Sequence, residues 1–194
     1  ALTLGGGEVT LLEITSTYGA LANGGVHLPP SSILCVLNAA GEVIERVDVP
    51  DLPEACRNAP LASQAVVQKP TEQRAASAQH AFLLTDILKD NEARTPAFGP
   101  NSWLNLGRPA AVKTGTTDGY HDAWTIGYTP QYVVGVWTGN TDYEATRKAT
   151  GSVIAAPLWN RIITYLHQGL PAEEFPFPGG IETATVDAVS GKLP

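Results

Sequence analysis

The chain has 194 residues, of which 43% are hydrophobic and 16% charged, so it is long and apolar enough to fold around a buried core. Twelve basic residues against nineteen acidic ones give a formal net charge of -7, and lysine and arginine form no cluster, which argues against nucleic acid as a partner. No stretch reaches the roughly 18 consecutive apolar residues that a membrane-spanning helix requires.

The start of the chain, ALTLGGGEVT, has neither the charged region nor the cleavage site of a signal peptide, and the chain contains no methionine. We therefore expect a piece of a longer protein, whose earlier part would carry any targeting signal or anchor. The cysteines, Cys35 and Cys56, lack the spacing of metal ligands. They are either two small buried hydrophobic residues or, outside the cytoplasm, a disulfide.

The first predicted element is an amphipathic helix over residues 10–23. Thr10 and Glu13 fit the T-x-x-E capping box, and apolar residues follow at helical spacing. The sequence Asn23-Gly24-Gly25 then favours a left-handed helix end.

A β-hairpin is predicted next, over residues 31–47. Two β-branched runs flank Asn38-Ala39-Ala40-Gly41, which has turn chemistry. Residues 48–70 contain four prolines and show no clear periodicity, so we predict an irregular surface connection there. Helical periodicity returns after Ser77, a plausible N-cap, and the face predicted to be buried carries Ala81, Leu84 and Leu88.

Three strands are predicted after Pro109, over residues 110–117, 123–128 and 132–138. Their connections are so short that neighbouring strands must be antiparallel. A helix over residues 155–168 follows, and its predicted buried stripe comprises Leu158, Ile162 and Leu166. The tail from residue 171 is rich in proline and glycine and is strand-like only at 183–186. The predicted fold class is α+β, a three-stranded antiparallel meander flanked by helices, with more strands expected from outside this chain.

The run from Lys113 to Thr117 (Lys-Thr-Gly-Thr-Thr) concentrates polar groups at the end of a predicted strand. Lys113 offers a compact positive charge, and Gly115 allows another backbone or a substrate to approach closely. Thr114 and Thr116 are interpreted as pointing to opposite faces, so that only one shares a face with a ligand. A strand edge of this kind suits an extended peptide that ends in a carboxylate. A nucleotide-binding P-loop is disfavoured, because the residue before Lys113 is valine and not glycine.

Several ordered motifs carry a resemblance to a known family. KTGTT is followed by DAWTIGYTP, VVGVWTGN and AAPLW, and about a hundred residues earlier the chain reads LTLGGGEVTLLEITSTYGALANGG. In this order they resemble the transpeptidase domain of class A penicillin-binding proteins, which are bifunctional peptidoglycan synthases. That family also has Ser-x-x-Lys and Ser-x-Asn motifs. No serine of this chain has Lys three positions on or Asn two positions on.

The resemblance implies that residues 1–170 are the C-terminal half of a penicillin-binding transpeptidase domain and that residues 171–194 are a C-terminal extension. The partners it implies are a peptidoglycan stem peptide ending in D-Ala-D-Ala, β-lactam antibiotics and the missing N-terminal half of the domain. No metal and no cofactor are expected, since His27, His80 and His167 are scattered and lack clustered partners. The location implied is extracytoplasmic, with anchoring through an upstream membrane helix that is absent from this chain.

The resemblance also assigns roles within the run. Lys113 would hydrogen-bond the serine of the absent Ser-x-Asn motif and assist proton transfer, while Thr114 would support the strand. Thr116 would bind the terminal carboxylate, and its backbone N–H would form half of an oxyanion hole. Gly115 would leave room for the acyl group, and Thr117 would be a secondary contact. The isolated chain is expected to be inactive, because its nucleophile is missing.

Two other function classes stay open. The chain is alternatively a non-catalytic peptidoglycan-binding or structural module, or part of a serine hydrolase such as a β-lactamase or D,D-carboxypeptidase. A Ser-His-Asp triad through His121 and Asp122 is disfavoured, because adjacent side chains diverge. Trp124, Trp137 and Trp159 are expected in the core, and Trp103 is a candidate for the rim of the cleft.

Overall fold

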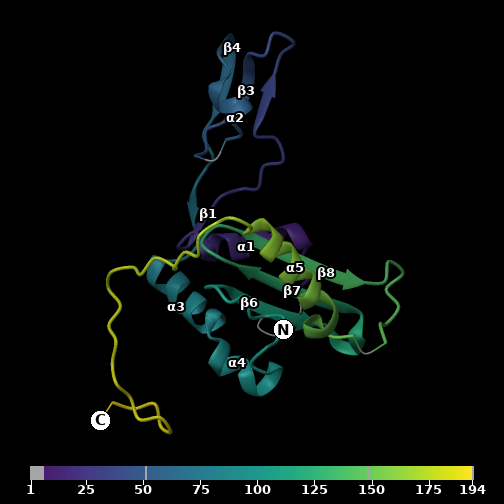
Figure 1. Cartoon of the computed structure of the whole chain (residues 1–194), viewed down its shortest axis with the longest axis vertical. Helices are drawn as coiled ribbons and strands as arrows, with labels where there is room; N and C mark the ends of the chain where they lie inside the picture. The colour runs from purple at the N-terminus through teal and green to yellow at the C-terminus, as the bar shows by residue number, and fades with distance from the viewer. Residues whose placement is uncertain (1–6, 51, 148, 194) are drawn as a thin grey trace.

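The computed structural model describes residues 7–50, 52–147 and 149–193. Its centre is an antiparallel sheet with the strand order β6-β7-β8, formed by β6 (Ala111–Thr116), β7 (Asp122–Tyr128) and β8 (Val133–Gly139) (Figure 1). Within the described residues β6 and β8 each pair on one side only, so both are edge strands. The predicted meander and the α+β class are confirmed.

Two helices, α1 (Leu11–Ala22) and α3 (Ala78–Lys89), cover one face of the sheet. Thr10 caps α1 in a complete capping box with Glu13, whose pKa is lowered by hydrogen bonds from the backbone and the hydroxyl of Thr10. The predicted first helix and its cap are therefore confirmed. On this face the side chains packed around buried Ala111, Tyr128 and Phe175 are Tyr18, Leu21, Ala22, Leu88 and Val133.

The opposite face is covered by the π-helical turn η3 (Gly151–Ala155) and by α5 (Ala156–Leu166). Trp159 and Ile163 are fully buried there. They pack with the sheet residues Val112, Val134 and Val136. The predicted buried stripe of this helix, Leu158, Ile162 and Leu166, was wrong, since these three residues are partly exposed. The neighbouring positions, Trp159 and Ile163, face the sheet instead.

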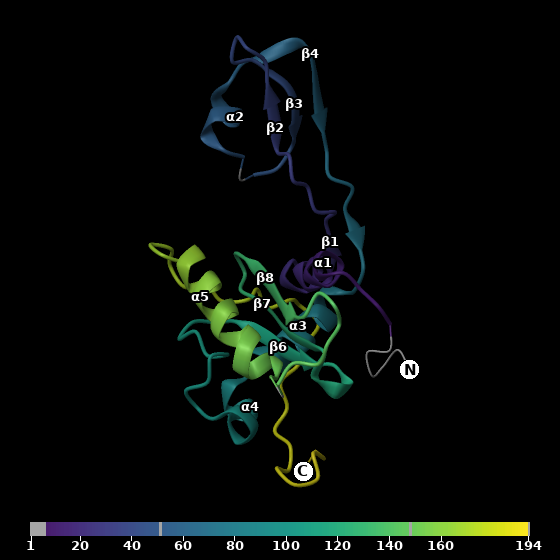
Figure 2. The same cartoon turned by 90° about the vertical axis from the view of Figure 1, so that its right-hand side faces the viewer.

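The excursion, residues 28–72, projects away from this body in both side views (Figures 1 and 2). At its base β1 (Val26–His27) pairs with β5 (Gln73–Arg74). The predicted hairpin is present as β2 (Cys35–Leu37) and β3 (Val43–Val47). The irregular connection predicted over 48–70 was wrong, since this segment contains α2 (Glu54–Asn58) and β4 (Leu61–Gln68), which pairs parallel to β3.

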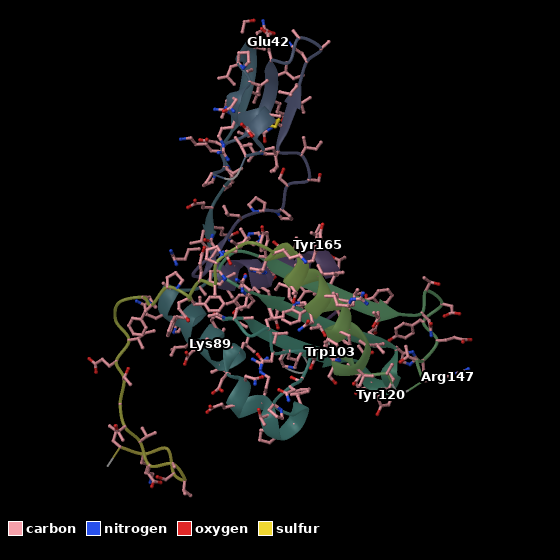
Figure 3. All side chains as sticks on the ribbon, viewed as in Figure 1. Glu42, Lys89, Trp103, Tyr120, Arg147 and Tyr165 are labelled. Atoms are coloured by element: carbon pink, nitrogen blue, oxygen red, sulfur yellow. A yellow bond between two sulfur atoms is a disulfide. The ribbon has the colours of Figure 1, made fainter. Side chains whose placement is uncertain are left out.

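A disulfide joins Cys35 of β2 to Cys56 of α2, with the two Cα atoms 6.1 Å apart (Figure 3). Of the two alternatives that the sequence left open, two buried free cysteines or a disulfide, the structure shows the disulfide. The bond lies wholly within the excursion, so it ties α2 to the small sheet and does not cross to the body. In Figure 3 Glu42 marks the far end of the excursion.

The remaining segments complete the body. A short helix that the sequence pattern missed, α4 (Asn91–Phe98), follows α3 directly, and Asp90 caps it. Of the face predicted for α3, Ala81 is buried but Leu84 is 48% exposed, and Thr85 takes its place against the sheet. The strand expected at 183–186 is absent from the described residues. No helix among them is long and apolar enough to cross a membrane.

The tail does not leave the body at residue 170. Phe175 is buried against Tyr128, and Phe177 stacks edge-on against Phe82 of α3 with ring centroids 5.0 Å apart. Gln79 also donates a hydrogen bond to the carbonyl of Gly179. Residues 175–179 therefore pack on the same core as α1 and α3, while a domain boundary at residue 170 stays a prediction.

Candidate active site

The Lys-Thr-Gly-Thr run occupies the second half of β6. Only β7 pairs with β6 among the described residues, so no described strand occupies the other edge of β6, where an extended ligand could pair. Side chains alternate along a strand, so Thr114 and Thr116 lie on the same face, the one covered by η3 and α5. The interpretation that they point to opposite faces was wrong, because residues two apart share a face. Lys113 and Gly115 belong to the other face.

Lys113 is exposed, and its ammonium donates to the carbonyl of Thr114 at 2.6 Å. The ion pair found among the described residues joins Lys89 to Asp86, and no carboxylate neutralises Lys113. An ammonium has three donor hydrogens, so two remain for a ligand or a catalytic partner. The strand therefore presents a positive charge beside its free edge.

Thr116 is exposed, and its Oγ1 accepts a hydrogen bond of 3.2 Å from the backbone N–H of Gly151. A hydroxyl can accept two hydrogen bonds and donate one. The contact with Gly151 thus uses an acceptor position and leaves the Thr116 hydrogen free for an anionic group. On the other face a Cβ on Gly115 would lie 3.5 Å from the Cβ of Trp124, so this position is not sterically closed.

Thr117 and Asp122 close the turn between β6 and β7. The Thr117 hydroxyl donates to Asp122 Oδ2 at 3.0 Å, and the backbone N–H of Asp122 donates back to Thr117 Oγ1 at 2.8 Å. The indole N–H of Trp137 donates to Asp122 Oδ1 at 2.8 Å. Asp122 therefore fixes the backbone just after Thr116.

The neighbouring His121 points elsewhere. Its Nδ1 lies 2.8 Å from the carbonyl of Tyr143, and the two rings stack with centroids 4.4 Å apart. Because Asp122 bonds Thr117 and Trp137 instead, His121 and Asp122 do not act as a pair. Among the described residues no group of three or more His, Cys, Asp or Glu side chains is arranged to hold a metal ion.

The tryptophans divide between core and surface. Trp159 is fully buried, as expected, but Trp137 is 36% exposed and bonds Asp122. Trp124 is partly buried and lies between Gly115 and Trp137 on one face of the sheet. Trp103 is 54% exposed and its carbonyl accepts from Asn160 of α5 (Figure 3). Its role at a cleft rim stays a prediction.

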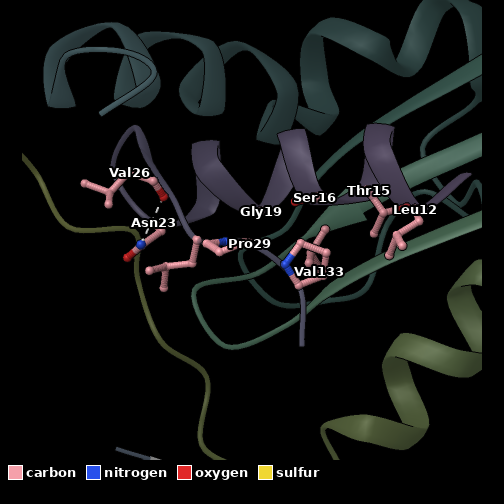
Figure 4. A pocket seen from close by; sticks show the side chains of 10 residues that line it. Leu12, Thr15, Ser16, Gly19, Asn23, Val26, Pro29 and Val133 are labelled. Atoms are coloured by element: carbon pink, nitrogen blue, oxygen red, sulfur yellow. Dashed lines mark hydrogen bonds between the residues drawn. The ribbon is translucent and has the colours of Figure 1, made fainter. Parts of the chain in front are cut away.

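A second polar pair was missed by the sequence reasoning, because its members lie eleven residues apart on different elements. Ser16 Oγ lies 2.9 Å from His27 Nε2. Ser16 also lines a cavity of about 420 Å³ (Figure 4). The cavity is mostly apolar and includes in its lining Leu12, Val26, Leu28, Pro29, Pro30 and Val133. Among the described residues no carboxylate hydrogen-bonds to His27, so the pair lacks the third group that orients a catalytic histidine.

Comparisons with a family model and with known sequences all match penicillin-binding proteins. The family model of the penicillin binding protein transpeptidase domain matches residues 2–164. Penicillin-binding protein 1A of Rickettsia bellii is 29% identical over 196 residues, covering 100% of this chain. Penicillin-binding protein 1A of Aquifex aeolicus is 32% identical over 179 residues, covering 92% of it. The chain spans only 24% and 21% of these two relatives, about a quarter of their length.

Solved structures agree with the fold. A crystal structure of penicillin-binding protein 1A from Haemophilus influenzae aligns with 100% of this chain and 32% of its own, with a TM-score of 0.77 and 21% identity, which shows the fold alone. The penicillin-binding protein PonA1 from Mycobacterium tuberculosis aligns with 87% of this chain and 41% of its own, with a TM-score of 0.62 and 25% identity. Since the family model covers most of its length, this chain belongs to the penicillin-binding protein transpeptidase domain family.

Proposed function

We propose that this chain forms one wall of a serine-type peptidoglycan D,D-transpeptidase and works together with an upstream part that supplies the nucleophile. The observation that carries this proposal is the edge of β6 that no described strand occupies. There the Lys113 ammonium, which no described carboxylate neutralises, and the available hydroxyl hydrogen of Thr116 lie three residues apart. Supporting it, the sequence contains neither a Ser-x-x-Lys nor a Ser-x-Asn motif. The chain also spans only about a quarter of the relatives it matches.

In the proposed reaction the upstream serine attacks the carbonyl of the penultimate D-Ala of a stem peptide. The C–N bond to the last residue breaks, a proton passes to its amine, and D-Ala leaves while the peptide stays on the serine as an ester. An amine from a neighbouring stem peptide then attacks the ester, forms the cross-linking amide and returns the serine hydroxyl. A β-lactam would acylate the same serine by opening its ring.

The residues of β6 would serve this reaction in four ways. Lys113 would hydrogen-bond the serine of the upstream Ser-x-Asn motif, raise the local positive potential and assist proton transfer. The Thr116 hydroxyl would bind the terminal carboxylate, and its backbone N–H would stabilise the oxyanion. Gly115 would leave space for the acyl group, and Thr117 would be a secondary contact. Thr114, which faces η3 and α5, would support the strand.

An enzyme with this substrate acts where peptidoglycan is assembled, so we propose an extracytoplasmic location with anchoring through a preceding segment. A neighbouring structure of penicillin-binding protein A from M. tuberculosis is described as an imipenem acyl-enzyme complex, and it aligns with 80% of this chain and 30% of its own at a TM-score of 0.52 and 26% identity. That likeness supports the proposal that β-lactams are ligands here.

Labelling with a fluorescent penicillin tests the proposed function. We expect the complete protein to form a covalent adduct visible by intact mass and this chain alone to form none. In the complete protein Lys113→Ala should slow acylation by about 100-fold or more, since it removes a positioned proton-transfer group. The matched control Lys69→Ala removes the same charge from the excursion and should leave the rate unchanged.

Each contrary outcome has a distinct meaning. An adduct on the isolated chain would show that it contains its own nucleophile. No adduct on the complete protein would favour a non-catalytic peptidoglycan-binding module. Acylation followed by hydrolysis only, even with an amine acceptor present, would favour a β-lactamase or D,D-carboxypeptidase. An unchanged rate in Lys113→Ala would refute the role of the lysine.

A further inference from the structure

The turn at Thr150–Gly151 lies directly behind the candidate site, on the face of β6 that carries Thr114 and Thr116. The backbone N–H of Gly151 donates to Thr116 Oγ1 at 3.2 Å. Its carbonyl accepts a hydrogen bond of 3.1 Å from the hydroxyl of Thr125, a fully buried residue in the neighbouring strand. The backbone N–H of Gly151 is therefore bonded to β6, and its carbonyl is bonded to β7.

Only a glycine fits at this position. A Cβ on Gly151 would lie 2.3 Å from the carbonyl oxygen of Trp124, 2.6 Å from that of Gly115 and 3.3 Å from the Gly115 nitrogen. These are backbone atoms, so they cannot rotate away. The absence of a side chain thus lets η3 rest on β6 and β7 at hydrogen-bonding distance, while the Gly151 backbone is not in the left-handed region.

The contact decides how the Thr116 hydroxyl can be used. An N–H pointing at the oxygen occupies one of its acceptor positions, and the hydroxyl hydrogen must point away from that N–H. Thr116 is exposed, so its hydrogen is left to donate outward. A hydroxyl whose hydrogen points outward favours a carboxylate over an amide, because a hydrogen bond donated to an anionic oxygen is charge-assisted and stronger than one donated to a neutral carbonyl.

We propose that Gly151, held in place by Thr125, is a positioning residue that fixes the Thr116 hydroxyl as a hydrogen-bond donor and so selects substrates ending in a free carboxylate. The inference rests on the proposed function, since it concerns the same substrate end. Gly151 and Thr125 would not touch the substrate. They act through Thr116. Changing them should therefore lower kcat/KM for substrates ending in a carboxylate more than for substrates ending in an amide.

The test compares Thr125→Val with Thr125→Ser in the complete protein. Valine has the shape of threonine without the hydroxyl, while serine keeps the hydroxyl. The substrates are a peptide ending in D-Ala-D-Ala and its C-terminal amide, and kcat/KM is measured from the release of D-Ala and of D-alaninamide. We expect Thr125→Val to lower kcat/KM for the acid by about tenfold and for the amide by less than about twofold, and Thr125→Ser to restore the preference.

A second measurement does not depend on Thr125→Val folding. Hydrogen exchange at the Gly151 amide should be at least about tenfold faster in Thr116→Val than in wild type, but not in Thr116→Ser, because only valine removes the acceptor. An equal loss for acid and amide would show a merely structural role for Thr125, and unchanged Gly151 exchange in Thr116→Val would also overturn the inference. If the wild-type protein released neither product, the proposed function itself would fail.

Discussion

At the scale of single residues, Tyr128 shows how burial sets chemistry in the core. Its side chain is fully buried, packs edge-on against Tyr18 and Phe175, and shares a 2.8 Å hydrogen bond with Thr85. The Thr85 hydroxyl already donates to the carbonyl of Ala81 at 2.8 Å, so the phenol is the donor to Thr85. Burial raises the pKa of Tyr128 to about 12.

This shift predicts a loss of stability in alkali. Below pH ~10, the ordinary tyrosine pKa, the phenol is protonated in both states and its contribution is fully present. Above it the unfolded chain loses the proton first, so the free energy of unfolding falls as pH rises toward about 12, the folded pKa. Urea midpoints at pH 9 and pH 11 measure the fall. It should be smaller in Tyr128→Phe, and an equal fall in both proteins would contradict this account.

The candidate site could be proposed from single residues of the sequence, because Lys113-Thr114-Gly115-Thr116 is contiguous and its residue types suit a peptide carboxylate. The partners of these residues could not be found in that way. Gly151 lies 35 positions from Thr116 in the sequence, and the residues around Gly151 do not predict the contact. Asp122 lies close to the run in sequence, but its bond to Trp137 depends on the pairing of β7 with β8.

At the scale of elements, the ends of helices were easier to predict than their buried faces. Caps are local, so Thr10 and Ser77 mark the starts of α1 and α3 as expected. The face of α5 was mispredicted because two neighbouring stripes are both apolar. Trp159 faces the sheet, since its ring fills the space left by Gly127. Periodicity alone does not choose between such stripes.

The packing of α5 on the sheet yields a prediction for Gly127→Ala. The new Cβ would lie 2.4 Å from Cζ2 of Trp159 and 2.9 Å from the carbonyl oxygen of Ala111, so the fully buried indole would have to move. We expect a loss of about 1–3 kcal/mol in the free energy of unfolding, measured by urea titration. The control Gly179→Ala meets no atom within 4 Å and should change stability by less than about 0.5 kcal/mol. A similar loss in both variants would argue against this packing.

At the scale of the whole molecule, the excursion and the body are held by different means. The body is packed by helices on both faces of one sheet, whereas the excursion has its own small sheet and the Cys35–Cys56 cross-link. At the base of the excursion the β1–β5 pair and Arg74, which donates to the carbonyls of Gly24 and Ala76, anchor it to α1 and α3. The disulfide closes a loop of 21 residues within the excursion.

Reduction should therefore act on the excursion alone. A loop of this size is worth about 3 kcal/mol in the chain-entropy model, so a thiol should raise amide hydrogen exchange in β2, β3 and α2 and leave β6, β7 and β8 protected. The double variant Cys35→Ala/Cys56→Ala should exchange like the reduced protein and be insensitive to the thiol. A rise of exchange throughout the central sheet on reduction would show that the two parts unfold together.

The sequence by itself determined the α+β class, the three antiparallel strands, the capped starts of the helices and the polar run at the end of β6, because each depends on neighbours along the chain. Only the tertiary structure decided which stripe of α5 is buried, that Cys35 meets Cys56, that β4 joins the small sheet, and that Gly151 lies behind Thr116. These outcomes depend on contacts between segments that are distant in sequence. There the fit between side chains, and the space left where a glycine has none, decide which of several apolar faces is buried.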